Sequence, residues 1–145
     1  MKQLSLVFSL LIILTGVVGC VTEGPANSAP VNQKMSSNKQ LSPVEGSLTV
    51  STTPFNSNLI DLTVKNMSRP NKINPRAKAY VVWEVPSGAK MKPQSIGILT
   101  PDKFSNARLM TATPFKQFDL FITAEATNNP VAPTGQKLLW TSVSR

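Results

Sequence analysis

Apolar and polar residues alternate in several short stretches of the chain after residue 44. In 58–65, Ile60, Leu62 and Val64 share one face of an extended chain, and the residues between them are polar. The same period of two recurs over 77–85, where the face that includes Glu84 is half polar and is expected to meet solvent or a loop. Further short apolar segments are 48–50, 95–98, 118–124 and 136–143, and 103–112 fits either a strand or one helical turn.

Prolines support an all-β fold, because a proline inside a helix costs about 3 kcal/mol or more. After residue 44 the longest segments without one are 55–69 and 115–129. Short strands joined by turns fit this spacing better than helices do. We therefore predict a small antiparallel β-sandwich of six to seven strands over 44–145. Its expected large core residues are Trp83, Trp140, Phe115, Phe118 and Phe121.

The first twenty residues predict an export signal with a lipid attachment site. Lys2 precedes a nearly unbroken apolar run, and small residues follow it. Val17-Val18-Gly19-Cys20 resembles the lipobox of bacterial lipoproteins, in which the cysteine is acylated and becomes the new amino terminus. The only cysteine of the chain lies at the one position that this chemistry requires. We therefore expect residues 1–19 to be a signal peptide and Cys20 to carry diacylglycerol and a fatty acid.

Residues 20–43 are expected to form a flexible linker between the lipid and the domain. They are rich in Asn, Ser, Pro and Gln and contain few large apolar residues, so they bury too little surface to offset the entropy of ordering. Val21 stands where enteric lipoproteins retained in the inner membrane carry Asp, which favours the outer membrane in a diderm organism. The protein is thus expected in the cell envelope, on the extracytoplasmic side.

The composition excludes much catalytic chemistry. The 145 residues contain no His and one Cys, which removes the commonest general base, intramolecular disulfides and cysteine-cluster metal sites. No Ser-x-x-Lys motif is present. Six acids follow the linker without a motif that pairs any two of them: Glu45, Asp61, Glu84, Asp102, Asp119 and Glu125. We expect a protein that is not an enzyme and has no cofactor or metal.

Short motifs in the second half of the chain resemble the anti-sigma-K factor C-terminal domain family. They are Tyr80-Val81-Val82-Trp83, Ser95-Ile96-Gly97-Ile98-Leu99, Phe121-Ile122-Thr123-Ala124-Glu125 and Pro133-Thr134-Gly135, and their order also fits. The match covers about 77–143. It implies an extracytoplasmic β-sandwich with a sensing or binding role. Asn128-Asn129 replaces the family's Gly-Gly turn, and neither its sigma-binding domain nor its spanning helix is recognisable here, so sigma-factor inhibition is not expected.

A basic segment is the clearest candidate binding surface. The net charge is +8, and five cations lie within 65–78 without an acid: Lys65, Arg69, Lys72, Arg76 and Lys78. They suit anionic lipid headgroups or acidic envelope polymers, although such a segment is also typical of a solvated loop. Nucleic acid is not expected, because the export signal separates the protein from it and no aromatics interleave the cations.

Aromatic residues on the expected strands allow a second kind of site. Tyr80, Trp83 and Trp140 suit either a glycan-stacking platform or, as is commoner for alternating strand positions, the core. The sequence thus predicts a lipid-anchored, non-catalytic interaction or sensing module that contacts another envelope protein. The alternative is a binder of anionic envelope polymer or lipid through the basic segment.

Overall fold

The computed structural model describes residues 29–39, 43–88 and 90–145. In chain order, the elements of these residues are β1 (Val31–Lys34), β2 (Ser36–Ser37), β3 (Glu45–Thr52), β4 (Asn58–Lys65), α1 (Pro70–Ile73), β5 (Ala79–Pro86), β6 (Gln94–Leu99), β7 (Ala107–Thr113), β8 (Gln117–Glu125) and β9 (Lys137–Ser144). The all-β class is therefore confirmed. The ambiguous segment 103–112 contains the greater part of strand β7.

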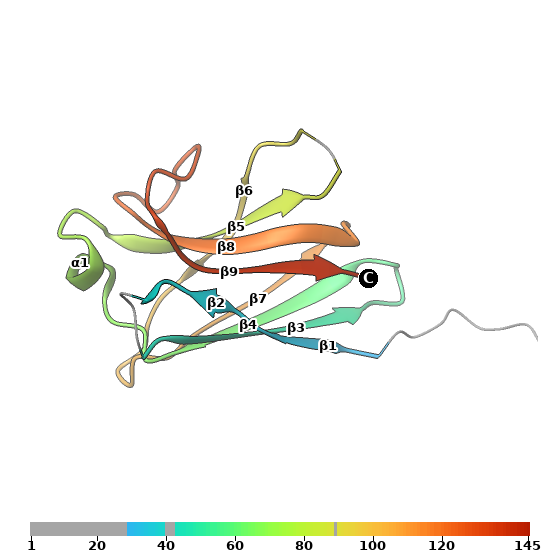
Figure 1. The fold of residues 1–145 in the computed structure, drawn as a ribbon, viewed down its shortest axis with the longest axis horizontal. Helices are drawn as coiled ribbons and strands as arrows, with labels where there is room; N and C mark the ends of the chain where they lie inside the picture. The colour runs from blue at the N-terminus through green and yellow to red at the C-terminus, as the bar shows by residue number, and fades with distance from the viewer. Residues whose placement is uncertain (1–28, 40–42, 89) are drawn as a thin grey trace, which may run out of the picture.

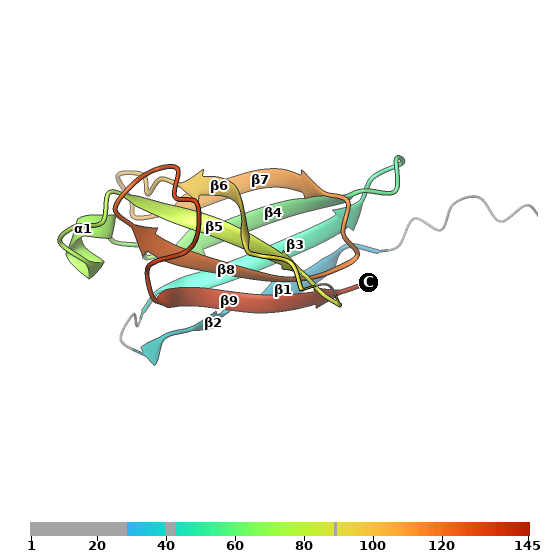
Figure 2. The same ribbon diagram turned by 90° about the horizontal axis from the view of Figure 1, so that it is seen from above.

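The strands form two antiparallel sheets that lie face to face (Figures 1 and 2). The first sheet has the order β1-β3-β4-β7, and the second has the order β2-β9-β8-β5-β6. Every pairing is antiparallel, and β6 and β7 end their sheets on the same side of the molecule. The predicted sandwich is confirmed, with β1 and β2 added to the expected strands.

The main core fills the space between the sheets. Ile60, Leu62 and Val64 of β4 have no exposed surface, as their alternation with polar residues predicted. Phe118 of β8 is also fully buried, and Phe115 packs against the core from the preceding turn. Each such side chain contributes about 1.5–3 kcal/mol on burial, so the packed inner faces supply the main stabilisation.

A second apolar cluster covers the outer face of the five-stranded sheet. It contains Ala79, Val81, Trp83 and Phe121. The rings of Trp83 and Phe121 stack with their centroids 6.5 Å apart. The β8–β9 connection, 126–136, rises over this face at the end where α1 lies (Figures 1 and 2). Strand β5 is therefore buried on both faces.

Two sequence predictions about burial are wrong. The half-polar face of β5 turns into the sandwich instead of meeting solvent or a loop, because Tyr80, Val82 and Glu84 are all buried, Tyr80 and Val82 within the main core. Trp140 is not a core residue, since 41% of its surface is exposed. Both errors arise because the covering element, a facing sheet or a long connection, cannot be assigned from the alternation within one strand.

The expected linker contains part of the folded domain. Residues 31–37 form β1 against β3 and then β2 against β9, so the chain passes from one sheet to the other along the side of the sandwich. Met35, between the two strands, is buried and donates its N–H to the carbonyl of Gly46 at 2.8 Å. The prediction of a linker to residue 43 is thus wrong for 31–37, while 20–28 and 40–42 lie outside the described residues.

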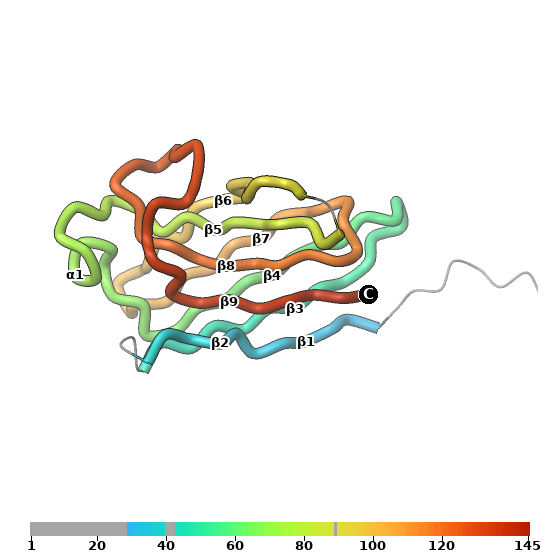
Figure 3. Tube along the Cα trace, turned by 45° about the horizontal axis from the view of Figure 1, so that its top comes forward, coloured from blue at the N-terminus to red at the C-terminus, as the bar shows by residue number. Residues whose placement is uncertain are grey.

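The sandwich has two distinct ends. The described chain begins at the end that holds Val31, the 53–57 and 114–116 turns and the C-terminus, here named the proximal end (Figure 3). The opposite, distal end holds Lys65, α1 and Glu125 (Figures 1 and 3).

Arg145 fixes the start of β1 at the proximal end. Its guanidinium donates to the carbonyls of Val50 at 3.1 Å and of Ala29, and to Thr52 Oγ1 at 3.2 Å. The last residue of the chain therefore holds the first residues of the described domain.

Candidate functional site

The basic segment 65–78 connects the two sheets at the distal end. Its five cations are Lys65 at the end of β4, Arg69 before α1, Lys72 within α1, and Arg76 and Lys78 before β5. All five are exposed. Among the described residues the only ion pair joins Arg108 to Asp61, so none of the five is neutralised by a carboxylate there. The predicted basic surface thus lies open to solvent at one end of the sandwich.

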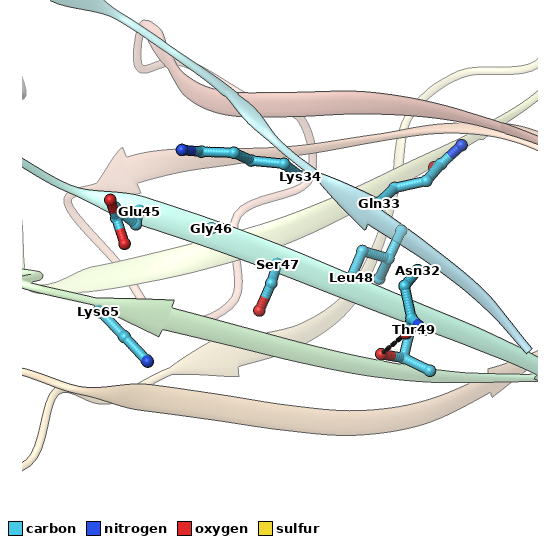
Figure 4. Close-up of a pocket in the computed structure, with 9 residues that line it drawn as sticks. All are labelled: Asn32, Gln33, Lys34, Glu45, Gly46, Ser47, Leu48, Thr49 and Lys65. Atoms are coloured by element: carbon cyan, nitrogen blue, oxygen red, sulfur yellow. Dashed lines mark hydrogen bonds between the residues drawn. The ribbon is translucent and has the colours of Figure 1, made fainter.

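Lys65 also belongs to a groove on the outer face of the four-stranded sheet (Figure 4). The groove has a volume of about 470 Å³ and is lined by side chains of β1, β3 and β4. Glu45 lies opposite Lys65 in the β3–β4 register, and Lys34 contributes a second cation from β1. Lys34 could not be assigned to this groove from the sequence, because only the pairing of β1 with β3 places it there.

Small hydroxyl and amide side chains form the floor of this groove. Ser47 and Thr49 project from β3, and Thr49 donates its hydroxyl hydrogen to Asn32 Oδ1 at 2.7 Å (Figure 4). Ser47 donates to the carbonyl of Thr63. Hydroxyl and amide groups therefore line the groove beside the charges of Glu45, Lys34 and Lys65, which suits a polar or charged molecule.

The three candidate aromatic residues do not form a common platform. Tyr80 points into the main core and donates its hydroxyl hydrogen to the carbonyl of Ser68 at 2.9 Å, and its burial raises the pKa to about 12. Trp83 lies in the outer cluster, on the other face of β5. Trp140 of β9 is the one with substantial exposure. The core interpretation is therefore correct for Tyr80 and Trp83.

Glu125 lies at the centre of a buried hydrogen-bond network at the distal end. Its carboxylate accepts from the hydroxyl of Thr123 at 2.5 Å and from the backbone N–H groups of Thr134 and Gly135 at 3.0 and 3.1 Å. The Thr134 hydroxyl donates to the other oxygen at 2.5 Å. Trp83 Nε1 in turn donates to Thr123 Oγ1 at 2.8 Å. The carboxylate thereby attaches the 126–136 connection to β8 and β5.

Burial and hydrogen bonding act in opposite directions on Glu125. Burial by itself raises its pKa, but the four donors from Thr123, Thr134 and Gly135 together outweigh burial and lower the pKa below its ordinary value of 4.5. A carboxylate satisfied by this many donors is fixed as an anion. The contacts therefore assign Glu125 a structural task, which is to hold the 126–136 connection.

Glu84 is the contrasting buried acid. It points inward from β5 near the proximal end, where burial raises its pKa above 4.5 and a hydrogen bond with Thr113 offsets only part of that effect. Its Oε1 has no hydrogen-bond partner, and neither has Oδ1 of Asn58, which stands opposite Thr113 in the β4–β7 register. Two buried acceptors therefore lie without a donor at this end of the core.

The other acids lie at the surface. Asp61 makes a bidentate ion pair with Arg108, at 2.6 and 2.8 Å, and this hydrogen bonding lowers the pKa of Asp61. Asp102 accepts from two backbone N–H groups of its own turn, and Asp119 accepts from the Ser142 hydroxyl at 2.6 Å. In the described part of the chain, no three acidic or cysteine side chains are grouped as metal ligands.

The predicted lipidation residue, Cys20, lies outside the described residues. No helix within them is long and apolar enough to cross a membrane. Comparison with protein-family models and with curated proteins finds no match to this chain. The structure does bring together the Thr123, Glu125, Thr134 and Gly135 motif residues of the anti-sigma-K resemblance, but membership of that family stays a prediction.

Proposed function

We propose that this chain is a lipid-anchored protein of the cell envelope whose β-sandwich is a non-catalytic module for binding another envelope protein. The anchor is supported by the apolar N-terminal run that ends at the single cysteine, Cys20. The binding module is supported by strand β6. The regulatory role suggested by the family resemblance is not part of the proposal.

Strand β6 is the observation that carries the proposed function. It ends the five-stranded sheet, and no described strand pairs with its second edge. Its six residues, Gln94–Leu99, contain no charge, and Ile98 has 39% of its surface exposed. Natural edge strands usually carry charges or prolines that prevent pairing with other chains, so an uncharged edge is suited to accept an added strand.

Site-specific crosslinking in cells tests this edge. A photoreactive amino acid is placed at residue 98 of the full lipidated chain, and captured proteins are identified by mass spectrometry. The matched control places it at Met110, which is exposed on β7 of the other sheet. We expect one envelope protein to be captured from position 98, to be retained at high salt, and to be lost in the Gly97→Pro variant.

The same experiment can reject the protein-binding function. Equal capture from positions 98 and 110 would show only random proximity. The proposal would also fail if Ser95→Lys, which adds a charge to β6 at an exposed position outside the core, left specific capture from position 98 unchanged. Acylation of Cys20, measured by mass of the purified N-terminal peptide, tests the anchor separately.

A second function is favoured by the exposure of the basic segment. Its five unpaired cations project from the distal end, where an anionic envelope polymer can contact them. Binding of this kind weakens steeply with ionic strength, whereas a packed protein interface weakens less. Neutralising Lys65, Arg69, Lys72 and Arg76 together should abolish binding to purified acidic polymer if this is the function, and should leave β6 crosslinking unchanged.

A further inference from the structure

The proximal end carries an aromatic side chain in an unusual position. Phe55 lies in the turn between β3 and β4 with 90% of its surface exposed, the largest exposure of any described aromatic residue. The turn itself is well ordered by hydrogen bonds. Thr53 N–H donates to the carbonyl of Ser57 at 2.8 Å, and Lys116 Nζ donates to the carbonyl of Asn56 at 2.8 Å. A defined turn therefore presents Phe55 to the surroundings.

Cations and no acids accompany Phe55 in the proximal turns. Lys116 follows β7, and Lys90 and Lys92 precede β6 at the same end. Met91, between those two lysines, has 38% of its surface exposed. Exposed aromatic and aliphatic side chains among lysines are typical of surfaces that bind the interface of an anionic bilayer.

The length of the tether decides which end faces the membrane. Only 11 residue steps separate Cys20 from Val31 (31 − 20). A coil of that length spans roughly 17–20 Å on average and about 35–40 Å when fully extended. An eight-residue strand is roughly 27 Å long. The distal end could therefore touch the bilayer only with the tether stretched beyond its average length, whereas the proximal end lies beside the anchor.

We infer that the proximal end docks on the anionic bilayer that holds the anchor, with Phe55 inserted at the headgroup level and the proximal lysines on lipid phosphates. This inference rests on the proposed acylation of Cys20. It orients the domain, because docking at this end directs the basic segment 65–78 away from the membrane. If the basic segment also binds a membrane, that membrane must be a different one from the bilayer that holds the anchor.

Tryptophan quenching by brominated lipid tests the docking. The acylated full chain is reconstituted in phosphatidylcholine–phosphatidylglycerol vesicles, with and without bromine on the acyl chains. Phe55→Trp is compared with Phe104→Trp, because Phe104 is also exposed, at 69%, but lies in the β6–β7 turn at the distal end. The chain without substitutions gives the fluorescence of the two native tryptophans, which is subtracted as the baseline.

We expect brominated lipid to quench the added fluorescence of Phe55→Trp and to leave that of Phe104→Trp unchanged. The fluorescence of Met91→Trp should be quenched as well. Adding Phe55→Ser to this variant should lower the equilibrium constant for docking about 10- to 100-fold, because the apolar surface of Phe55 is no longer buried in the bilayer. Equal quenching at both ends, or none in vesicles that float with the protein, would overturn docking while leaving the anchor intact. If the chain purified from cells carried no acyl group on Cys20 and also failed to float with the vesicles, both the anchor and the docking would be overturned.

Discussion

Replacing Glu125 by Gln tests whether the carboxylate network holds the β8–β9 connection in place. The substitution keeps the shape of the side chain and removes its charge. In the parent, all four hydrogen-bonding groups around the carboxylate are donors: the hydroxyls of Thr123 and Thr134, and the N–H groups of Thr134 and Gly135. A Gln amide can accept these bonds at only one of its two terminal atoms.

The size of the effect follows from these contacts. In the better amide orientation, the oxygen takes the place of Oε1 and keeps three bonds, from Thr123, Thr134 and Gly135, but without charge assistance. A hydrogen bond to a charged group contributes about 1.5–3 kcal/mol against about 0.5–1.5 kcal/mol for a neutral one. A loss of about 1 kcal/mol at each of three bonds gives about 3 kcal/mol. For a domain of this size, that lowers Tm by more than about 10 °C.

The assay is urea unfolding of parent and variant between pH 3 and pH 8. The folded-state pKa of Glu125 is lowered, so its stabilisation is fully present above the ordinary value of 4.5 and is lost as the pH falls through the folded value. The difference between parent and Glu125→Gln should therefore be largest near neutral pH and shrink on acidification. Asp119→Asn, an exposed change on the same strand, should shift stability by less than about 0.5 kcal/mol.

Either of two results would refute this reasoning. One is a Glu125→Gln variant whose free energy of unfolding stays within about 0.5 kcal/mol of the parent at pH 7. The other is a large difference that does not depend on pH, because a loss caused by shape or packing would not follow the titration of a carboxylate.

Three further predictions concern other buried positions. Glu84→Gln should raise the free energy of unfolding at neutral pH. The folded-state pKa of Glu84 is raised, so the parent protein loses stability as the pH rises above 4.5. Urea unfolding should show the gain at pH 7 and no gain at pH 4. Gly135→Ala should cost about 1–3 kcal/mol in thermal unfolding, since its Cβ would lie 2.5 Å from the carbonyl oxygen of Ala124. Met35→Ala should cost about 2–5 kcal/mol by the same measurement if β1 and β2 belong to the domain, whereas a mere linker would show no change.

The strands with strong local alternation could be predicted from the sequence. The interval 58–65 matches β4 residue for residue, because Ile60, Leu62 and Val64 on one face alternate with polar residues on the other. The segment 31–37, which passes from one sheet to the other, could not be predicted in this way. Residues 31–37 are polar apart from Val31 and Met35, and their pairing energy comes from β3 and β9, whose nearest paired residues in sequence, Lys34 and Ser47, are 13 positions apart (47 − 34).

The candidate site shows the same division. The basic segment 65–78 is contiguous, so its cations were visible in the sequence, and in the structure all five cations are exposed. The groove that joins Lys34 to Lys65 was not visible, because it depends on the order β1-β3-β4. The buried acids were missed because charge predicts exposure, and only the donors around Glu125, or the facing strand at Glu84, explain their burial.

The path of the chain through β1 has a mechanical consequence. In a protein held by its N-terminus and engaged at its distal end, tension enters at Val31 and runs along the strand direction. The hydrogen bonds between β1 and β3 lie perpendicular to that direction, so they are loaded together in shear instead of opening one after another. The Arg145 guanidinium adds a crosslink at the loaded end. If the proposed anchor holds the N-terminus, a pull on it therefore loads the β1–β3 pairing in shear, which favours resistance to peeling of this strand.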